Sequence, residues 1–313
     1  MHKQAFLMLF TALCIIAGLL MTGLCLYGWG SWIMSPEHFR PLPHGPDQYA
    51  LSKLIALRIY ETISAVGMLV MIYVLLIKPW RGGEGLTLYG KLFIGYTLAF
   101  FIDVGINYYE YTFAWNTHAL NMGVWLPWVP GHKFNHRYAE SLVWCWPQYA
   151  YFSVALSALI AWGVKVLEVH GIKLLPAMSL LFCVCFVFDI IWEQIMVRWE
   201  LYAFPRGFSW FTLFAGTQFQ HPLNNSISVA LYPIPVALLI RAEWAGRNFL
   251  DRGLATIAGP SSSLMRTLLS LLAVIGLCSA SLILFFHGPW ALISLVTDVN
   301  LSVTDLPSYL RYE

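Results

Sequence analysis

Long apolar runs alternate with short polar breaks along this chain, and this pattern predicts a polytopic bundle of helices. Seven stretches are long enough to cross a bilayer, because a spanning helix needs about 20 predominantly apolar residues. These stretches cover residues 5–31, 51–79, 88–115, 147–168, 174–199, 223–244 and 266–288. Gly, Pro and charged residues cluster in the breaks between them. We therefore expect an all-α fold, with one integral-membrane domain over residues 1–313.

The composition supports a membrane protein and excludes several other classes. Of the 313 residues, 59% are hydrophobic and 11% are charged, whereas about 25% of residues are charged in soluble domains. A formal net charge of +2 provides no basic surface for nucleic acid. The expected partners are the lipid bilayer and an apolar small molecule. Lys and Arg residues are more numerous on the side of the N-terminus, which predicts a multi-pass cell-membrane protein with a cytoplasmic N-terminus.

Three of the segments between the spans are unusual for loops in water. Residues 32–50, 116–146 and 200–222 are rich in aromatic residues, Pro and Gly, and poor in charge. They could form an aromatic belt at the membrane interface. Alternatively, they cap an intramembrane cavity, because irregular backbone at membrane depth must be buried in protein.

Acidic residues within the predicted spans carry most of the functional argument. Five carboxylates fall there, namely Glu61, Asp103, Glu110, Asp189 and Glu193. A charged residue at the centre of a spanning helix costs ~2.5–3.5 kcal/mol on insertion scales, so each should face the bundle interior or water. Helical spacing places Asp103, Asn107 and Glu110 on one face, at i, i+4 and i+7. Asp189 and Glu193 share a face of another span, at i and i+4.

The depth of these residues in their spans suggests a common chamber. At a rise of about 1.5 Å per residue, Glu61, Asp103 and Asp189 lie roughly 15–18 Å from the same ends of their spans. Structural roles are the alternative: Arg58 and Glu61 could form an ion pair within one helix, and Asp103 could bond Asp189 across two helices. Carboxyl groups crowded in a low-dielectric site cannot all ionise. Some would then be proton donors and others anions, as acid–base chemistry requires.

Histidines offer a competing hypothesis of a metal site. His132 and His136 stand at i and i+4, and His118 and His221 border the same region. The segment follows a Pro-Gly pair and need not be helical, so we predict no metal and no cofactor. Three other histidines are expected at the membrane interface, namely His44, His170 and His287.

Two blocks of sequence resemble the AveC-like (avermectin-type) spirocyclases. The first contains FIDVGINY at 101–108, WNT at 115–117, NMGVW at 121–125 and VPG at 129–131. The second contains FDIIWE at 188–193 and FAGTQFQHPLN at 214–224. The order and spacing of the two blocks match the family, and the resemblance is strongest across residues 98–131 and 184–232.

The resemblance implies cofactor-free closure of a dihydroxyketone polyketide to a spiroketal. Such closure proceeds through an oxocarbenium ion, as glycoside hydrolysis does. In such a site we expect Asp103 and Asp189 to handle protons, with Glu110 and Glu193 as second carboxylates. The substrate-binding candidates are Asn107, Asn116, Trp115, Trp125, His221, Asn224, Glu61 and Arg58.

Other functions compatible with the sequence remain open. An integral-membrane terpenoid cyclase or isomerase also needs a buried acid and aromatic faces that attract a cation. A lipid or small-molecule transporter would use the carboxylates to relay protons. An assembly factor without chemistry would need no cavity at all.

Overall fold

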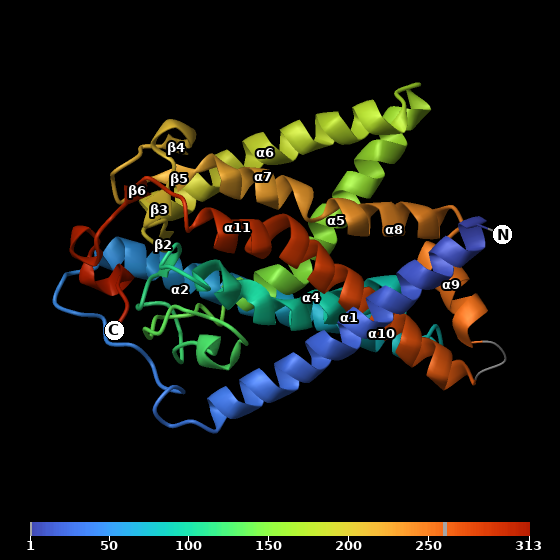
Figure 1. Cartoon of the computed structure of the whole chain (residues 1–313), viewed down its shortest axis with the longest axis horizontal. Coiled ribbons are helices and arrows are strands. Elements are labelled where there is room, and N and C mark those ends of the chain that lie inside the picture. Colours follow the sequence, from blue (N-terminus) through green and yellow to red (C-terminus); the bar gives the residue numbers. More distant parts are fainter. Residues whose placement is uncertain (1, 259–261) are drawn as a thin grey trace.

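The computed structural model describes residues 2–258 and 262–313, and it confirms the predicted all-α bundle (Figure 1). Within the described residues, seven helical segments are long and apolar enough to cross a membrane. They are Gln4–Ile33, Leu51–Arg81, Leu88–Asn107, Cys145–Val169, Leu174–Arg198, Leu223–Trp244 and Ser263–Ile293. The component α-helices are α1 (His2–Ile33), α2 (Leu51–Ile72), α3 (Lys78–Arg81), α4 (Leu88–Ala99), α5 (Cys145–Val169), α6 (Leu174–Arg198), α7 (Leu223–Leu231), α8 (Ile234–Trp244), α9 (Phe249–Ala258), α10 (Ser263–Leu282) and α11 (Gly288–Ile293).

The third predicted span is too long, because its helix ends at Asn107. After α4 the chain tightens into a 3-10 helix, Phe100–Asn107, with about three residues per turn. The Asn107 side chain then accepts hydrogen bonds from the backbone N–H groups of Thr112 and Phe113, at 2.8 and 2.9 Å. These bonds turn the chain back. The prediction that Glu110 lies inside this span and shares a helical face with Asp103 is therefore wrong.

Two π-helical turns interrupt the long helices, each two residues before a proline. Tyr73–Ile77 precedes Pro79, and Ile283–His287 precedes Pro289. Proline lacks an N–H group and its ring clashes with the carbonyl four residues earlier. A wider turn accommodates both effects while the helix continues.

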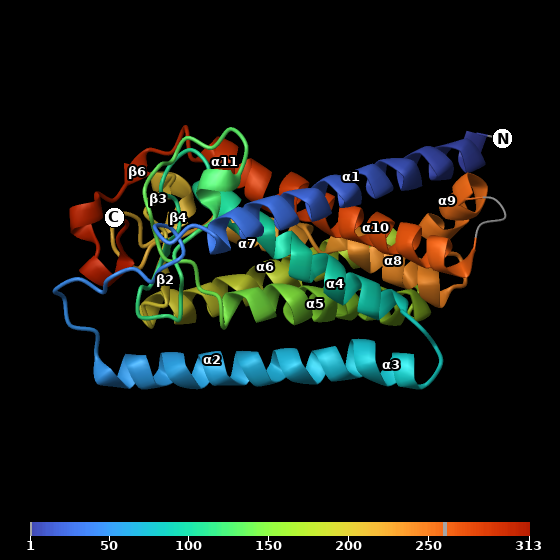
Figure 2. The same cartoon turned by 90° about the horizontal axis from the view of Figure 1, so that it is seen from below.

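Some helices form the centre of the bundle and others its periphery. In the most apolar stretch of the spans built on α4 and on α7–α8, 61% of the residues are buried in the protein. The corresponding shares for the spans of α2 and α6 are only 11% and 17%. Figure 2 shows α2 lying along one side of the bundle and α1 along the other. The contact between α1 and α10 depends on glycine, because a Cβ atom on Gly18 would lie 2.0 Å from the carbonyl oxygen of Leu272.

Short strands and loops gather at the end of the bundle that holds the C-terminus (Figure 1). Three antiparallel pairs form there. They are β1 (Ala114–Trp115) with β2 (Tyr202–Ala203), β3 (Arg206–Gly207) with β6 (Val299–Asn300), and β4 (Thr212–Leu213) with β5 (His221–Pro222). In the first pair Trp115 lies opposite Tyr202. The aromatic loops thus fold over one end of the helices.

Candidate active site

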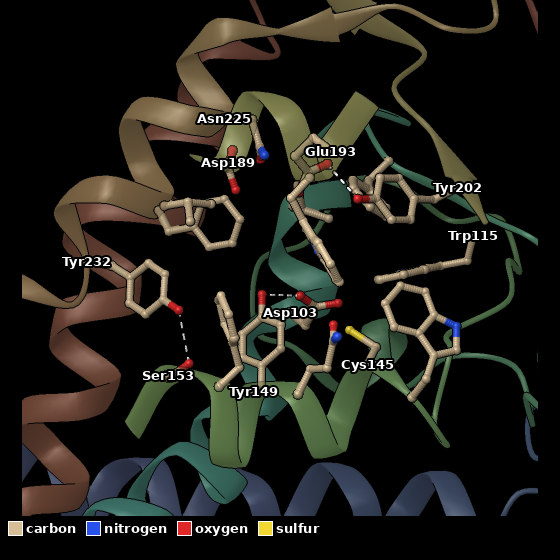
Figure 3. Close-up of a pocket in the computed structure, with 18 residues that line it drawn as sticks. Asp103, Trp115, Cys145, Tyr149, Ser153, Asp189, Glu193, Tyr202, Asn225 and Tyr232 are labelled. Atoms are coloured by element: carbon tan, nitrogen blue, oxygen red, sulfur yellow. Dashed lines mark hydrogen bonds between the residues drawn. The ribbon is translucent and has the colours of Figure 1, made fainter. Parts of the chain in front are cut away.

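A cavity of about 120 Å³ lies beneath these loops (Figure 3). Its walls come from the 3-10 helix Phe100–Asn107, from α5, α6 and α7, and from the β1 and β2 strands. Aromatic rings form much of the lining, namely Phe113, Trp115, Trp144, Tyr149, Phe152, Trp192, Tyr202, Tyr232 and Phe286. The polar lining includes three carboxylates, Asp103, Asp189 and Glu193. Acidic groups therefore meet in one largely aromatic enclosure.

One wall carries Asp103 and, beside it, a tyrosine that also lines the cavity. The hydroxyl of Tyr149 on α5 donates a hydrogen bond to Asp103 Oδ1. The same hydroxyl lies 3.1 Å from Nε2 of His287. Oδ2 of Asp103 has no hydrogen-bond partner among the described residues.

A fourth carboxylate, Glu140, lies next to Asp103 but outside the cavity lining. Glu140 is completely buried, and no described residue gives either of its oxygens a hydrogen bond of regular geometry. Burial, together with the neighbouring Asp103 carboxyl, raises the pKa of Glu140 well above its ordinary value. Its surroundings therefore favour the protonated form of Glu140, which has a proton available to Asp103.

The facing wall carries Asp189 and Glu193, one helical turn apart on α6 (Figure 3). Tyr202 on β2 donates a 2.6 Å hydrogen bond to Oε2 of Glu193. Asp189 differs, since its Oδ2 has no partner among the described residues. Burial and the Glu193 carboxyl raise the pKa of the Tyr202 hydroxyl, which keeps this group a proton donor.

The site thus contains two carboxyl pairs, Asp103 with Glu140 and Asp189 with Glu193. Two adjacent carboxylates in a dry site cannot both be charged without a counter-ion. In each pair, one carboxyl group accepts a hydrogen bond from a tyrosine hydroxyl and the other does not. Since a donated hydrogen bond favours the charged form of a carboxyl group, the two tyrosine contacts favour the charged forms of Asp103 and Glu193.

Part of this cluster also has the donor set of a metal site. Ligand atoms of Asp103, Glu140 and Cys145 lie within 4.8 Å of one another, and all three residues are buried. Two carboxylates and a thiolate could hold a divalent ion such as Zn²⁺ with one position open. The histidine pair of the earlier metal hypothesis is not helical, because the described chain between His132 and His136 is irregular.

Comparison with known proteins identifies the family. A sequence model described as "Spirocyclase AveC-like" matches residues 85–307. The chain belongs to the AveC-like spirocyclase family. The matched range contains both carboxyl pairs and every strand of the loop end. No curated protein and no solved structure matches the chain significantly.

Four of the residues expected to form the spirocyclase site line the cavity. They are Asp103, Asp189, Glu193 and Trp115. Asn224 does not line it, although its buried side-chain amide lacks a partner among the described residues. Its neighbour Asn225 lines the cavity instead, on the first turn of α7.

Glu110 and Asn107 lie outside the cavity lining. Glu110 forms a 2.8 Å ion pair with Arg206 on β3, and its side chain is 42% exposed. Asn107 uses its side-chain amide to bond Phe113 and Thr112, as described above. Glu110 follows the end of the helix, and this explains why it does not join Asp103.

Arg58 and Glu61 hold a loop against α2. The two side chains form an ion pair, and Glu61 Oε1 accepts a 2.7 Å hydrogen bond from the N–H of Leu120. Arg58 donates to the carbonyl of His118. Asn116 ties the same loop to the carbonyl of Glu200, at 2.7 Å. These three residues therefore hold the loop in position and do not line the cavity.

Trp125 and His221 are buried near the cavity without lining it. Trp125 packs against Trp29, Trp32 and Phe100, and its indole N–H donates to the carbonyl of Phe101 at 2.8 Å. His221 Nε2 lies 2.8 Å from Oγ of Ser226. Burial lowers the pKa of His221 to about 3, so its imidazole is neutral.

Sequence reasoning missed Glu140, Tyr149, Tyr202 and His287. His287, which was expected at the membrane interface, lies inside the protein, where its side chain is only 2% exposed. His287 ends the π-helical turn Ile283–His287, and this wider turn changes the direction of its side chain. Glu140 stands in an otherwise charge-poor aromatic loop, and that isolation was the available signal.

Proposed function

We propose that this chain is a membrane-embedded spirocyclase that closes a dihydroxyketone, of the polyketide type, to a spiroketal. The observation that carries this proposal is that Asp189, whose Oδ2 has no partner among the described residues, faces the tyrosine-bonded Asp103 across one aromatic cavity. Membership of the spirocyclase family gives the reaction class. The two walls supply the proton donor and the proton acceptor that the reaction needs.

The reaction begins from the hemiketal, which a hydroxyketone forms when one hydroxyl adds to its carbonyl carbon. Asp189 gives its proton to the hemiketal hydroxyl, the carbon–oxygen bond breaks, and water leaves. The remaining ring oxygen shares the positive charge as an oxocarbenium ion. Carboxylates at Asp103 and Glu193 stabilise this cation electrostatically, more strongly than they would in water.

The second hydroxyl then attacks the cationic carbon and gives its proton to Asp103. The new carbon–oxygen bond completes the spiroketal, and the overall change is the loss of one water. One proton transfer from Asp103 to Asp189 resets the site, so the cycle consumes no external acid. Proton transfer by such positioned groups contributes typically about 10²–10⁴-fold in rate.

The aromatic lining gives the reaction its stereochemistry. Rings of Trp115, Trp144 and Trp192 border the cavity and can stabilise a cation through their π faces. They also fix the fold of an apolar chain, so that one face of the cation meets the second hydroxyl. The cavity is smaller than the roughly 300–1,000 Å³ of typical ligand pockets, so binding requires the walls to part.

Embedding in a lipid bilayer fits the outward surface of the bundle. Large apolar side chains such as Ile59, Ile63 and Leu69 on α2 are more than half exposed. Water would penalise such a surface, whereas lipid does not. We place the N-terminus in the cytoplasm, on the positive-inside argument.

The test uses membranes that contain the protein and a symmetric dihydroxyketone whose product spiroketal is chiral only at the spiro carbon. Uncatalysed acid closure gives equal amounts of the two mirror images. The spirocyclase should give an excess of one, measured by chiral gas chromatography. Equal amounts from native membranes and from membranes without the protein, for this ketone and for longer apolar analogues, would contradict the proposal.

A further inference from the structure

His287 is a buried histidine that does not line the active-site cavity. Its side chain is 2% exposed, and its Nε2 atom lies 3.1 Å from the Tyr149 hydroxyl. The Tyr149 and His287 rings are stacked, with centroids 6.1 Å apart. Nδ1 has no hydrogen-bond partner among the described residues. Tyr149 is therefore the hydrogen-bond partner of the imidazole among the described residues.

The hydrogen bonds of Tyr149 fix the state of this imidazole. A phenol carries one proton, and Tyr149 donates it to Asp103. Its oxygen is then free only to accept, so the Nε2–H group of His287 must be the donor. His287 is consequently the Nε2–H tautomer. A chain of two hydrogen bonds runs from His287 through Tyr149 to the Asp103 carboxylate.

The local backbone holds His287 in this position. The residue ends the π-helical turn Ile283–His287, and such turns occur frequently at functional sites. On the other side, a Cβ atom on Gly105 would lie only 3.8 Å from Cβ of His287. The Phe286 ring also lies close, with its centroid 4.5 Å from that of His287. Phe286 therefore bounds the ring on one side, while His287 and Gly105 also border a second cavity, of about 390 Å³.

We propose that His287 is a positioning residue, which acts on Asp103 through Tyr149 by holding the Tyr149 hydroxyl against Asp103 Oδ1. This inference rests on the proposed function for its catalytic consequence. Hydrogen bonds in series polarise one another, so a donor at Nε2 strengthens the bond that Tyr149 gives to Asp103. Without the Nε2–H donor the Tyr149 hydroxyl can rotate away from Asp103. Asp103 is then protonated more readily and can no longer accept the proton of the second substrate hydroxyl.

Other titratable groups lie next to this hydrogen-bond chain and contribute to its dependence on pH. Glu140 and Cys145 lie beside Asp103, and Tyr232 lies beside Tyr149. A second buried histidine, His221, contacts the Ser226 hydroxyl near Asp189 on the facing wall. His221 provides a comparison, because a change there should affect the acid Asp189 and not the carboxylate Asp103.

The kinetic test compares His287→Leu with His287→Gln, whose amide N–H can still donate to Tyr149. His287→Leu should lower kcat about tenfold, the effect of one charge-linked hydrogen bond, with KM changed less than twofold. The acid limb of the pH profile should move to higher pH, because Asp103 protonates more readily. His287→Gln should recover most of kcat and restore the limb. In a Tyr149→Phe background, His287→Leu should have no further effect.

His170→Gln is the matched control, since His170 is exposed at the far end of α5 and its side chain bonds only the carbonyl of Val166 among the described residues. It should leave the rate and the profile unchanged. The proposal fails if His287→Leu lowers kcat without moving the acid limb, if its effect adds fully to that of Tyr149→Phe, or if kcat is unchanged.

A spectroscopic arm separates this proposal from the proposed function. Protein with ¹⁵N-labelled histidine should show the signal of an Nε2–H tautomer that disappears in His287→Gln, shifts in Tyr149→Phe and is separate from the signal of the other buried histidine, His221. This measurement needs no substrate. If no ketone is closed but these signals behave as described, the proposed function fails and the hydrogen-bond chain from His287 to Asp103 is supported. An Nδ1–H tautomer at His287 would overturn that hydrogen-bond chain itself.

Discussion

The Tyr202 hydroxyl donates a 2.6 Å hydrogen bond to Glu193, and this contact joins a strand of the loop end to α6. Glu193 is one turn from Asp189, so the bond fixes the charged member of the pair beside the acid. We expect Tyr202→Phe to lower kcat about tenfold, since a hydrogen bond to a charged group is worth about 1.5–3 kcal/mol. Turnover of the dihydroxyketone in membranes measures this effect. An unchanged rate would show that Glu193 needs no donor.

The two aspartates should be far more sensitive than the tyrosine. Asp103→Asn and Asp189→Asn each remove a proton-transfer group while preserving shape, and each should lower turnover roughly 100-fold or more. Glu110→Gln is the matched carboxylate control, because Glu110 pairs with Arg206 outside the cavity. It should retain near-native activity. If both asparagine variants stay active while folded and membrane-inserted, the acid–base assignment is wrong.

Glu140 makes stability depend on pH in a defined direction. Its pKa is raised in the folded state above the ordinary value of 4.5 by burial and by Asp103. Above that pH the folded chain binds more protons than the unfolded chain, so the unfolding free energy falls as pH rises. Glu140→Gln removes this term. Between pH 5 and 8, the stability measured by thermal unfolding in detergent should therefore fall less in Glu140→Gln than in the native chain. Equal slopes of stability against pH in the two proteins would contradict the raised pKa of Glu140.

The contact of α1 with α10 should reject even a methyl group. A Cβ atom on Gly18 would lie 2.0 Å from the carbonyl oxygen of Leu272, so Gly18→Ala forces the helices apart. Overpacking of this kind costs typically about 1–3 kcal/mol. Gly23→Ala on the same helix meets nothing within 4 Å and should leave stability unchanged or raise it. Unfolding midpoints of the two variants in detergent decide the point, and equal midpoints would rule out a tight glycine contact.

The buried Asp103, Glu140 and Cys145 cluster makes metal dependence a direct question. The proposed chemistry needs only protons, so a chelator such as EDTA should leave turnover unchanged. Cys145→Ser should also keep most activity, because Cys145 takes no part in the proton transfers. Loss of activity in chelator, with recovery on adding Zn²⁺, would instead assign these three residues as metal ligands.

The long helices could be predicted from the sequence, because runs of 20 or more apolar residues have few alternatives in a membrane. Asp103, Asp189 and Glu193 could be predicted for a related reason: a carboxylate within such a run must turn inward. Glu110 could not be placed correctly, since the helical period was assumed to continue. The local capping by Asn107 ended it three residues earlier.

The residues that support the carboxylates were harder to predict. Tyr149 and Tyr202 have no distinctive spacing, and tyrosines are common at membrane interfaces. Glu140 lies in a loop, so no periodic pattern tied it to Asp103. The burial of His287 depends on a π-helical turn that arises from Pro289 and from packing, rather than from any repeat in the residues before it.

The turn at Ile283–His287 contains one more residue than an ordinary α-helical turn. Each residue of an α-helix advances the side-chain direction by about 100°. An extra residue in a regular α-helix would rotate everything after it by that angle, whereas the wider turn takes up the extra residue and lets α11 continue in phase with α10. His287 ends this wider turn, so the length of the segment matters for the position of the imidazole as well as the identity of its residues.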